Sequence, residues 1–192
     1  MESVKRNSSE VKITVIEKAL ESNSPNVVFL PGIGNFGAAM KRMQEAGFKN
    51  LIQDLSNSEV KVVGICLALQ LFGLASEESP NVEGLGIIPG TSSKLPVSNE
   101  EKIPNVGWSE VSLKNLSAPF QSLSTQRDYY FVHSYSFLPD DQETILGTSK
   151  FGNYEFVSAV HRDNLLAFQF HPEKSGNPGN ALMKEILEWA NE

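Results

Sequence analysis

The sequence has little cysteine, little histidine and few basic residues. Its single cysteine, Cys66, excludes an intramolecular disulfide and a cysteine-rich metal site, and favours a reducing compartment. Sixteen lysines and arginines against 23 aspartates and glutamates give a net charge of −7, which argues against a general nucleic-acid or membrane-surface binder. No apolar run approaches the roughly 18 residues that a membrane span needs. We therefore expect a cytoplasmic protein with no metal ion, no nucleic-acid partner and no membrane contact.

The length fits one domain at roughly 150 residues per domain, so a single domain over residues 1–192 is expected. In the first half, short apolar runs alternate with helical patterns. This alternation is typical of an α/β fold with parallel strands and helical crossovers. The expected strands are Val11–Ile16, the fully buried Val27–Leu30 and Val60–Ile65; the expected helices are Glu17–Ser22, Ala38–Ala46, Phe48–Leu55 and Leu67–Ala75.

The second half is richer in strands that are separated by short turn signals, and this spacing favours antiparallel pairing. A last helix is expected with Asn177 as its N-cap and Pro178 at its first position, ending near Trp189. The expected strands are Leu85–Ile88, Trp108–Leu113, Tyr129–Phe137, Thr144–Ser149, Phe156–His161 and Leu165–Phe170.

A glycine-rich loop over residues 32–37, GIGNFG, lies between an expected strand and an expected helix, as in a dinucleotide site. A dinucleotide site also needs an acidic residue at the end of the next strand, to bind the ribose hydroxyls. That strand ends at Cys66, and Asp54 lies in a helical pattern instead. A loop whose backbone N–H groups stabilise a developing anion therefore fits better than a dinucleotide site.

The single cysteine lies at a strand-to-helix turn. Gly64 and Ala68 flank it at the spacing of the nucleophile elbow, in which small residues allow a tight turn that exposes the central side chain. The helix start that follows favours a thiolate. The alternative is a buried cysteine that packs as a small apolar residue, and the pattern alone leaves both open.

A thiolate nucleophile needs a base and a group that orients the base. Of the three histidines, His161 beside a charged turn is expected on the solvated surface. His133, within a strand, is expected to pack or hydrogen-bond in the core. His171 ends an apolar strand, and Glu173 follows two residues later. An imidazole and a carboxylate at one strand end can form the base and its orienting partner.

Short motifs carry a family resemblance. GIC at 64–66 and FHPE at 170–173 resemble class I (triad) glutamine amidotransferases. PGIGNFG at 31–37, PNVGW at 104–108, YFVHSY at 130–135 and FHPEKSG at 170–176 are similar to the glutaminase subunit of imidazole glycerol phosphate synthase. The resemblance covers about residue 11 to the end. It implies a flavodoxin-like three-layer α/β sandwich with an antiparallel extension.

The resemblance also implies roles for individual residues. Cys66 would attack the side-chain amide of glutamine, His171 would pass the thiol proton to the leaving ammonia, and Glu173 would orient His171. The implied oxyanion site is Gly32, Ile33, Gly34 and Leu67. The implied glutamine site is Gln70, Glu78, Ser134 and Tyr135, and the implied partner interface is Trp108, Tyr130 and Lys174.

The implied partner is a (β/α)₈ cyclase subunit in a heterodimer. It would receive the ammonia and make imidazole glycerol phosphate and aminoimidazole carboxamide ribotide, in histidine biosynthesis. The resemblance implies no cofactor.

Two features depart from the family. The family's opening strand and its Asp-Tyr-Gly-x-Gly-Asn loop have no counterpart, so residues 1–10 are expected to be disordered or the remnant of a first helix, and Val11–Ile16 to match the second strand. A missing central strand would leave an unpaired strand edge. Ala68 stands where the elbow usually has glycine.

Two other functions stay open at this point. A paralogous amidotransferase subunit that supplies ammonia for surface-sugar biosynthesis would share the triad. A catalytically silent regulatory module would fit the two departures.

Overall fold

The computed structural model describes residues 12–17, 25–96, 102–114, 120, 122–125 and 128–192. Its largest sheet has six strands in the order β1-β2-β11-β10-β9-β6. Three of them are parallel, namely β1 (Val27–Gly32), β2 (Lys61–Cys66) and β11 (Leu165–Phe168). The expected parallel strands of the first half are thus confirmed for β1 and β2.

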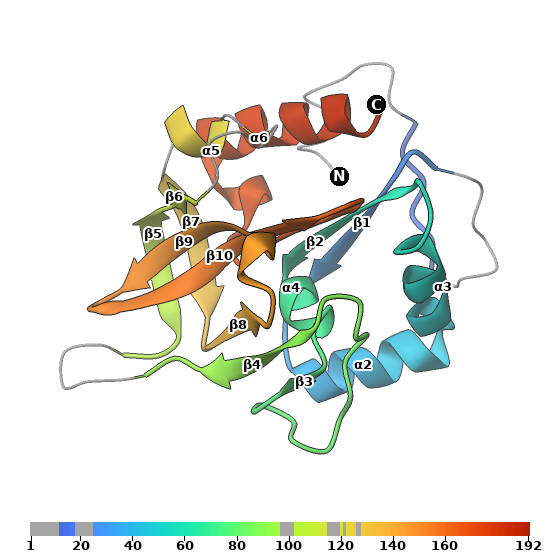
Figure 1. Cartoon of the computed structure of the whole chain (residues 1–192), viewed down its shortest axis with the longest axis horizontal. Helices are drawn as coiled ribbons and strands as arrows, with labels where there is room; N and C mark the ends of the chain where they lie inside the picture. Colours follow the sequence, from blue (N-terminus) through green and yellow to red (C-terminus); the bar gives the residue numbers. More distant parts are fainter. Residues whose placement is uncertain (1–11, 18–24, 97–101, 115–119, 121, 126–127) are drawn as a thin grey trace.

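Helices cover both faces of this sheet (Figure 1). On one face lie α2 (Phe36–Glu45), α3 (Phe48–Leu55) and α4 (Leu67–Leu71). On the other face lie α5 (Ser122–Thr125) and α6 (Gly176–Trp189). These are the three layers that the family resemblance implied.

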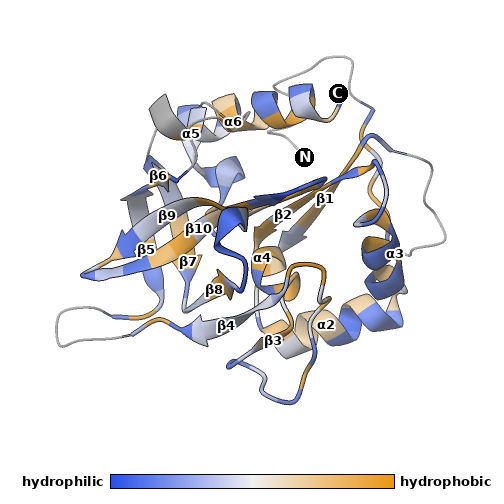
Figure 2. Cartoon of the chain, in the orientation of Figure 1, coloured by the Kyte–Doolittle hydropathy of each residue, from blue (hydrophilic) through white to orange (hydrophobic). Residues whose placement is uncertain are grey.

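Each face of the sheet has its own hydrophobic core, because successive side chains of a strand point to opposite faces. Val62 of β2 packs in the cluster that contains Phe36 and Ile52, whereas its neighbour Val63 packs in the cluster that contains Ile186. Figure 2 shows both hydrophobic and hydrophilic residues along α2 and α3, as expected of helices that bury one side.

The antiparallel extension is confirmed. The strands β10 (Tyr154–Arg162), β9 (Ile145–Phe151) and β6 (Ser112–Leu113) continue the large sheet beyond β11. A two-stranded sheet pairs β5 (Asn105–Glu110) with β7 (Asp128–His133). A further sheet contains β3 (Ala75–Ser76), β4 (Gly90–Lys94) and β8 (Tyr135–Pro139), and the 3₁₀ helices are η2 (Gln142–Thr144) and η3 (Pro172–Lys174).

Several expected strands have other bounds. The expected strand Tyr129–Phe137 breaks at Ser134 into β7 and β8, which belong to different sheets. The expected strand Leu85–Ile88 is wrong, since these residues form bends and coil before β4. The helix expected to reach Ala75 ends at Leu71, because Ala75 pairs with β4 instead. An apolar run indicates that a segment is buried, but it does not indicate whether the segment pairs as a strand or with which neighbour.

The N-terminal strand expectations also need correction. Residues 12–16 form no strand, residue 11 and residues 18–22 of the expected first helix lie outside the described residues, and so do residues 1–10. The strand β1 is half-buried rather than fully buried. Within the described part of the chain it is the last strand of its sheet, so one of its edges has no hydrogen-bonded neighbour.

The last helix begins two residues before Pro178, which was expected at its first position. The backbone N–H of Gly179 already donates to the carbonyl of Ser175, so the helix starts at Gly176 and Asn177 is not its N-cap. The helix ends at Trp189, as expected.

Candidate active site

Cys66 lies at the junction between β2 and α4, in a backbone conformation that side chains rarely adopt. Its φ is 55° and its ψ is −105°. Among the described residues, only Cys66 and Asp163 have a positive φ without being glycine. A Cβ at Gly64 would lie 2.9 Å from the Phe72 ring, which explains the small residue there. Such strain is retained where the surrounding structure holds it, often at functional sites.

Ala68, which replaces the usual elbow glycine, is fully buried. Its backbone N would lie 3.2 Å from a Cβ at Gly32, so the close approach in this turn is accommodated by Gly32 instead. The turn that the sequence predicts is therefore present with alanine in place.

His171 and Glu173 lie at the end of β11, which is the neighbour of β2 in the sheet. The Nδ1–H of His171 donates to Oε1 of Glu173 at 2.7 Å. The imidazole is buried, whereas the carboxylate is 38% exposed. Because Nδ1 is used by Glu173, the buried Nε2 is the ring atom left to exchange a proton with Cys66, with which His171 interacts.

The backbone around His171 is held by neighbouring elements. Its N–H donates to the carbonyl of Tyr130 on β7 at 2.9 Å. Ser175 connects the same two segments, because its hydroxyl donates to the carbonyl of His171 and accepts from the N–H of Tyr130. The imidazole is thus fixed in position by β7 as well as by β11.

Electrostatics favour a charged His171 and a charged Glu173. Burial alone lowers the pKa of His171, but its interactions with Cys66 and Glu173 outweigh burial and raise the pKa to about 9. Burial raises the pKa of Glu173, whereas the hydrogen bond and charge of His171 lower it, and the net pKa is lowered. The arrangement can therefore hold an imidazolium beside a carboxylate near neutral pH.

A hollow of about 370 Å³ opens beside the cysteine. It is lined by Ile33, Gly34, Cys66, Leu67, Gln70, Glu78, Pro104, Val132, His133, Ser134, Tyr135 and Lys174. The structure thus brings together the four residues of the implied glutamine site with three of the four residues of the implied oxyanion site. The fourth, Gly32, lies directly opposite Cys66 in the β1–β2 pair.

The glycine-rich loop leads into α2, but the helix start is already occupied. The N–H of Phe36 donates to Oε2 of Glu78 at 2.5 Å, and the N–H of Gly37 donates to the hydroxyl of Ser79 at 3.1 Å. These are the groups that would bind the phosphates of a dinucleotide. The contact between Glu78 and α2 was not predicted, because nothing in the sequence pairs residues 42 positions apart.

The three residues of the implied partner interface lie together, and one of them borders the hollow. Trp108 of β5 is opposite Tyr130 of β7, with ring centroids 6.0 Å apart, and 56% of Trp108 is exposed. The Nζ of Lys174 lies 5.9 Å from the centre of the Tyr130 ring. Lys174 also lines the hollow, so it joins this surface to the site.

The two other histidines have different surroundings. His133 is buried; its Nδ1–H donates to the carbonyl of Tyr135, and its Nε2 accepts from Asn105, as a core histidine. Burial, the larger effect, lowers its pKa to about 4 despite the Tyr135 bond. The expectation that His161 is solvated needs correction, because the residue is only partly exposed, its ring packs against Phe120 and Trp189, and burial lowers its pKa.

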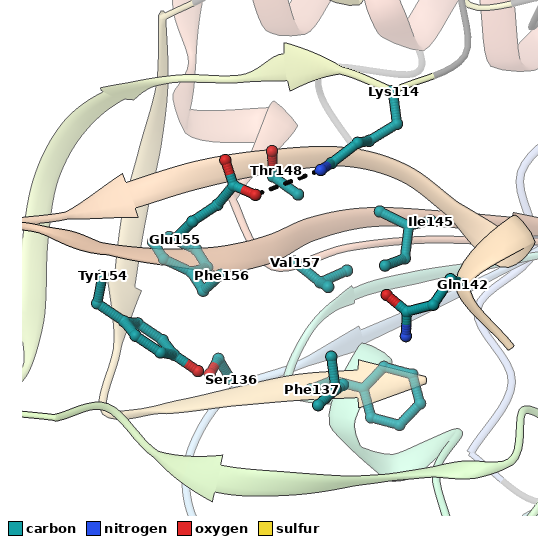
Figure 3. Close-up of a pocket in the computed structure, with 11 residues that line it drawn as sticks. Lys114, Ser136, Phe137, Gln142, Ile145, Thr148, Tyr154, Glu155, Phe156 and Val157 are labelled. Carbon is teal, nitrogen blue, oxygen red and sulfur yellow. Dashed lines mark hydrogen bonds and ion pairs between the residues drawn. The ribbon is translucent and has the colours of Figure 1, made fainter. Parts of the chain in front are cut away.

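A second hollow, of about 120 Å³, does not have Cys66 among its lining residues and is shown in Figure 3. Apolar side chains of β8, β9 and β10 line it, and Lys114 pairs with Glu155 at 3.3 Å beside it. None of its lining residues is a cysteine or a histidine. It therefore offers no nucleophile and base comparable to Cys66 and His171.

None of the helices in the described part of the chain has the length and apolar character to span a bilayer. In the same part of the chain, no three or more histidine, cysteine, aspartate or glutamate side chains are grouped so that they could hold a metal ion.

Comparison with known proteins settles the family. The model of the family "Glutamine amidotransferase class-I" matches residues 2–188. An imidazole glycerol phosphate synthase subunit HisH from Chlorobaculum tepidum is 37% identical over 179 residues, which cover 93% of this chain and 89% of the relative. The chain belongs to the class-I glutamine amidotransferase family. A HisH subunit from Pyrococcus furiosus is 40% identical over 86% of this chain and 83% of its own length.

Solved structures agree with the fold. A crystal structure of a glutamine amidotransferase superposes with a TM-score of 0.70 at 16% identity, over 100% of this chain and 92% of that one. The activity of the chain is thus that of a glutamine amidotransferase. In this family setting, the dinucleotide alternative for the glycine-rich loop is not supported.

Proposed function

We propose that this amidotransferase hydrolyses glutamine through a thioester on Cys66. The observation that carries the proposal is the buried imidazole of His171, which interacts with Cys66 and is held by Glu173 through Nδ1. His171 holds the thiol proton as an imidazolium, and the Cys66 thiolate attacks the amide carbon. His171 then returns this proton to the leaving nitrogen, so ammonia departs and a glutamyl thioester remains. Water attacks the thioester by the same proton route, and glutamate is released.

The oxyanion of the tetrahedral intermediate is held by backbone N–H groups. Leu67 begins α4, and the first N–H groups of a helix have no partner within the helix. Gly34, with φ of 106°, turns the loop that presents Ile33 at the rim of the hollow. Losing one such donor costs roughly 3 kcal/mol of transition-state stabilisation.

The glutamine substrate is gripped by Gln70, Glu78, Ser134 and Tyr135, which line the hollow. One oxygen of Glu78 accepts a hydrogen bond from the N–H of Phe36 at the start of α2, and this bond orients the carboxylate. Its other oxygen then pairs with the α-ammonium group of the substrate.

The ammonia passes to a (β/α)₈ cyclase subunit in a heterodimer, which makes imidazole glycerol phosphate for histidine biosynthesis. The names of the relatives support this partner, and so does the surface formed by Trp108, Tyr130 and Lys174 beside the hollow. Ammonia that escaped to water would be protonated and lose its nucleophilicity, which favours a closed passage between the subunits. The cytoplasmic location and the single domain stay predictions.

Glutamine hydrolysis measured with and without the partner tests this proposal. We expect the rate of glutamate release to rise about tenfold or more when a cyclase subunit and its ribonucleotide ligand are both present, which is within the usual range of coupling between sites. The cyclase without its ligand is the control. If no cyclase stimulates hydrolysis, the chain supplies a different synthase, such as one for surface sugars. If hydrolysis is absent throughout, it is a silent module.

The exposed Trp108 provides a test of the interface. Replacing Trp108 with alanine should weaken cyclase binding about tenfold or more, because partly exposed tryptophans are frequent anchors of protein interfaces. The dissociation constant is measured by titration calorimetry. Leu138 is exposed to the same extent, 56%, and Leu138→Ala is the matched control, for which no loss is expected. Equal affinities of both variants and the wild type would place the interface elsewhere.

A further inference from the structure

Gln169 is a fully buried glutamine between β11 and His171, and none of the assigned roles includes it. Its backbone N–H donates to the carbonyl of Ser158 at 2.9 Å, which anchors the residue to β10. Its side-chain Nε2 lies 3.8 Å from the sulfur of Cys66, and its Oε1 accepts from Nε2 of Gln70 at 3.2 Å. The carboxamide thus lies between the cysteine and a residue of the glutamine site.

The orientation of this carboxamide follows from its neighbours. Nε2 of Gln70 also donates to the backbone carbonyl of Tyr135 at 3.1 Å, which only an N–H group can do. The same nitrogen therefore needs an acceptor on its other side, and Oε1 of Gln169 is that acceptor. Turning the Gln169 amide around would place two donors against each other. The N–H of Gln169 must then face the sulfur.

Two polar groups contact the Cys66 sulfur with opposite preferences. The carbonyl of Val132, 3.7 Å away, can only accept, so it favours the protonated thiol. The N–H of Gln169 can only donate, so it favours the thiolate. Once the thiol proton moves to His171, the Val132 contact becomes unfavourable, whereas the Gln169 contact becomes a charge-assisted hydrogen bond.

The same contacts orient Gln70. Both protons of its Nε2 are used, by Tyr135 and by Gln169. Its carbonyl Oε1 is therefore the atom left for a donor group of a molecule in the hollow, which Gln70 lines.

We propose that Gln169 is a positioning residue that stabilises the Cys66 thiolate through its N–H and holds Gln70 so that its carbonyl faces the substrate. This inference rests on the proposed roles of Cys66 and Gln70 in glutamine hydrolysis. The inference assigns one buried amide two contacts, one with the nucleophile and one with the glutamine site.

Alkylation of Cys66 by iodoacetamide tests the first half without any glutamine turnover. Because the chain has one cysteine, the rate is read directly from intact mass. In Gln169→Leu, which removes the donor at nearly constant volume, we expect the rate at pH 7 to fall about tenfold, as for a lost hydrogen bond to a charged group. The pH at which the rate reaches half of its plateau should rise. An unchanged profile in the folded variant would overturn the proposal.

A second variant separates the two contacts of Gln169. In Gln169→Glu the side chain can still accept from Gln70 but cannot donate to the sulfur. The alkylation profile should shift at least as far as in Gln169→Leu, because a carboxylate also repels the thiolate, while the KM for glutamine should rise less than in Gln169→Leu. A greater KM increase in Gln169→Glu would contradict the proposed hold on Gln70.

Gln142→Leu is the matched control, because Gln142 lines the hollow of Figure 3 and donates to the carbonyl of Pro139 rather than to Cys66. Its alkylation profile should equal that of the wild type, and an equal shift in both leucine variants would overturn the proposal.

If neither Gln169 variant folds, NMR of the wild type tests the contact between Gln169 and Cys66. The side-chain amide signal of Gln169 should move when Cys66 is alkylated, and an unmoved signal would reject the contact. The alkylation and NMR readouts stay valid if the chain proves unable to hydrolyse glutamine, so the two proposals fail separately.

Discussion

Replacing Cys66 with serine is expected to abolish glutamine hydrolysis, by about 10⁴-fold or more. A serine hydroxyl is far less acidic than a thiol, so His171 cannot generate an equally reactive nucleophile. The smaller oxygen fits the same strained turn, so the thermal unfolding temperature should change little. Ammonia release is measured with a coupled assay.

Labelling with a glutamine-like electrophile complements the kinetics of Cys66→Ser. The wild type should gain one adduct on Cys66, and the variant none. Cyclase binding by the variant is the control, since Cys66 is buried whereas Trp108 of the implied interface is exposed. Turnover by Cys66→Ser at the wild-type rate would refute the role of Cys66 as nucleophile.

The second large effect is expected for Glu173→Gln, which should lower kcat about 10²-fold. The amide cannot compensate the imidazolium charge, and it can turn its NH₂ group toward Nδ1 of His171, which disfavours the productive ring tautomer. Because the carboxylate is 38% exposed, water replaces part of its effect, so the loss should stay below that of Cys66→Ser. The rate of glutamate formation under saturating glutamine provides the measurement. Glu155→Gln is the control, because Glu155 is a half-exposed carboxylate on β10 that pairs with Lys114.

The Glu173 variant should also change the pH dependence of stability. The pKa of His171 is about 9 in the folded protein, above its usual value near 6.5, so protonation stabilises the folded state. This contribution is fully present below about pH 6.5 and is lost as the pH rises through about 9. The difference in unfolding temperature between wild type and Glu173→Gln should therefore narrow from pH 6.5 to pH 9.5. A constant difference would mean that the pair does not stabilise the fold through its charges.

The candidate triad was within reach of sequence reasoning because its residues end adjacent parallel strands. The turn at Cys66 and the His171–Glu173 pair are local patterns, and the carboxyl ends of neighbouring strands meet at one edge of a sheet. Gln169, by contrast, precedes the FHPE motif at 170–173, and no sequence pattern indicated a role for it. Its contact with Cys66 spans 103 positions, and no local pattern specifies a contact of that range.

The sequence by itself determined the α/β alternation, the antiparallel second half and the cysteine elbow. These depend on local periodicity, on turn residues and on small side chains beside one reactive group. Only the tertiary structure decided how the site is built: Glu78 occupies the start of α2, Ser134 separates two sheets, and Gln169 lies between Cys66 and Gln70. Such contacts depend on which distant segments pack together, and buried polar groups select their partners only once burial has removed water as an alternative.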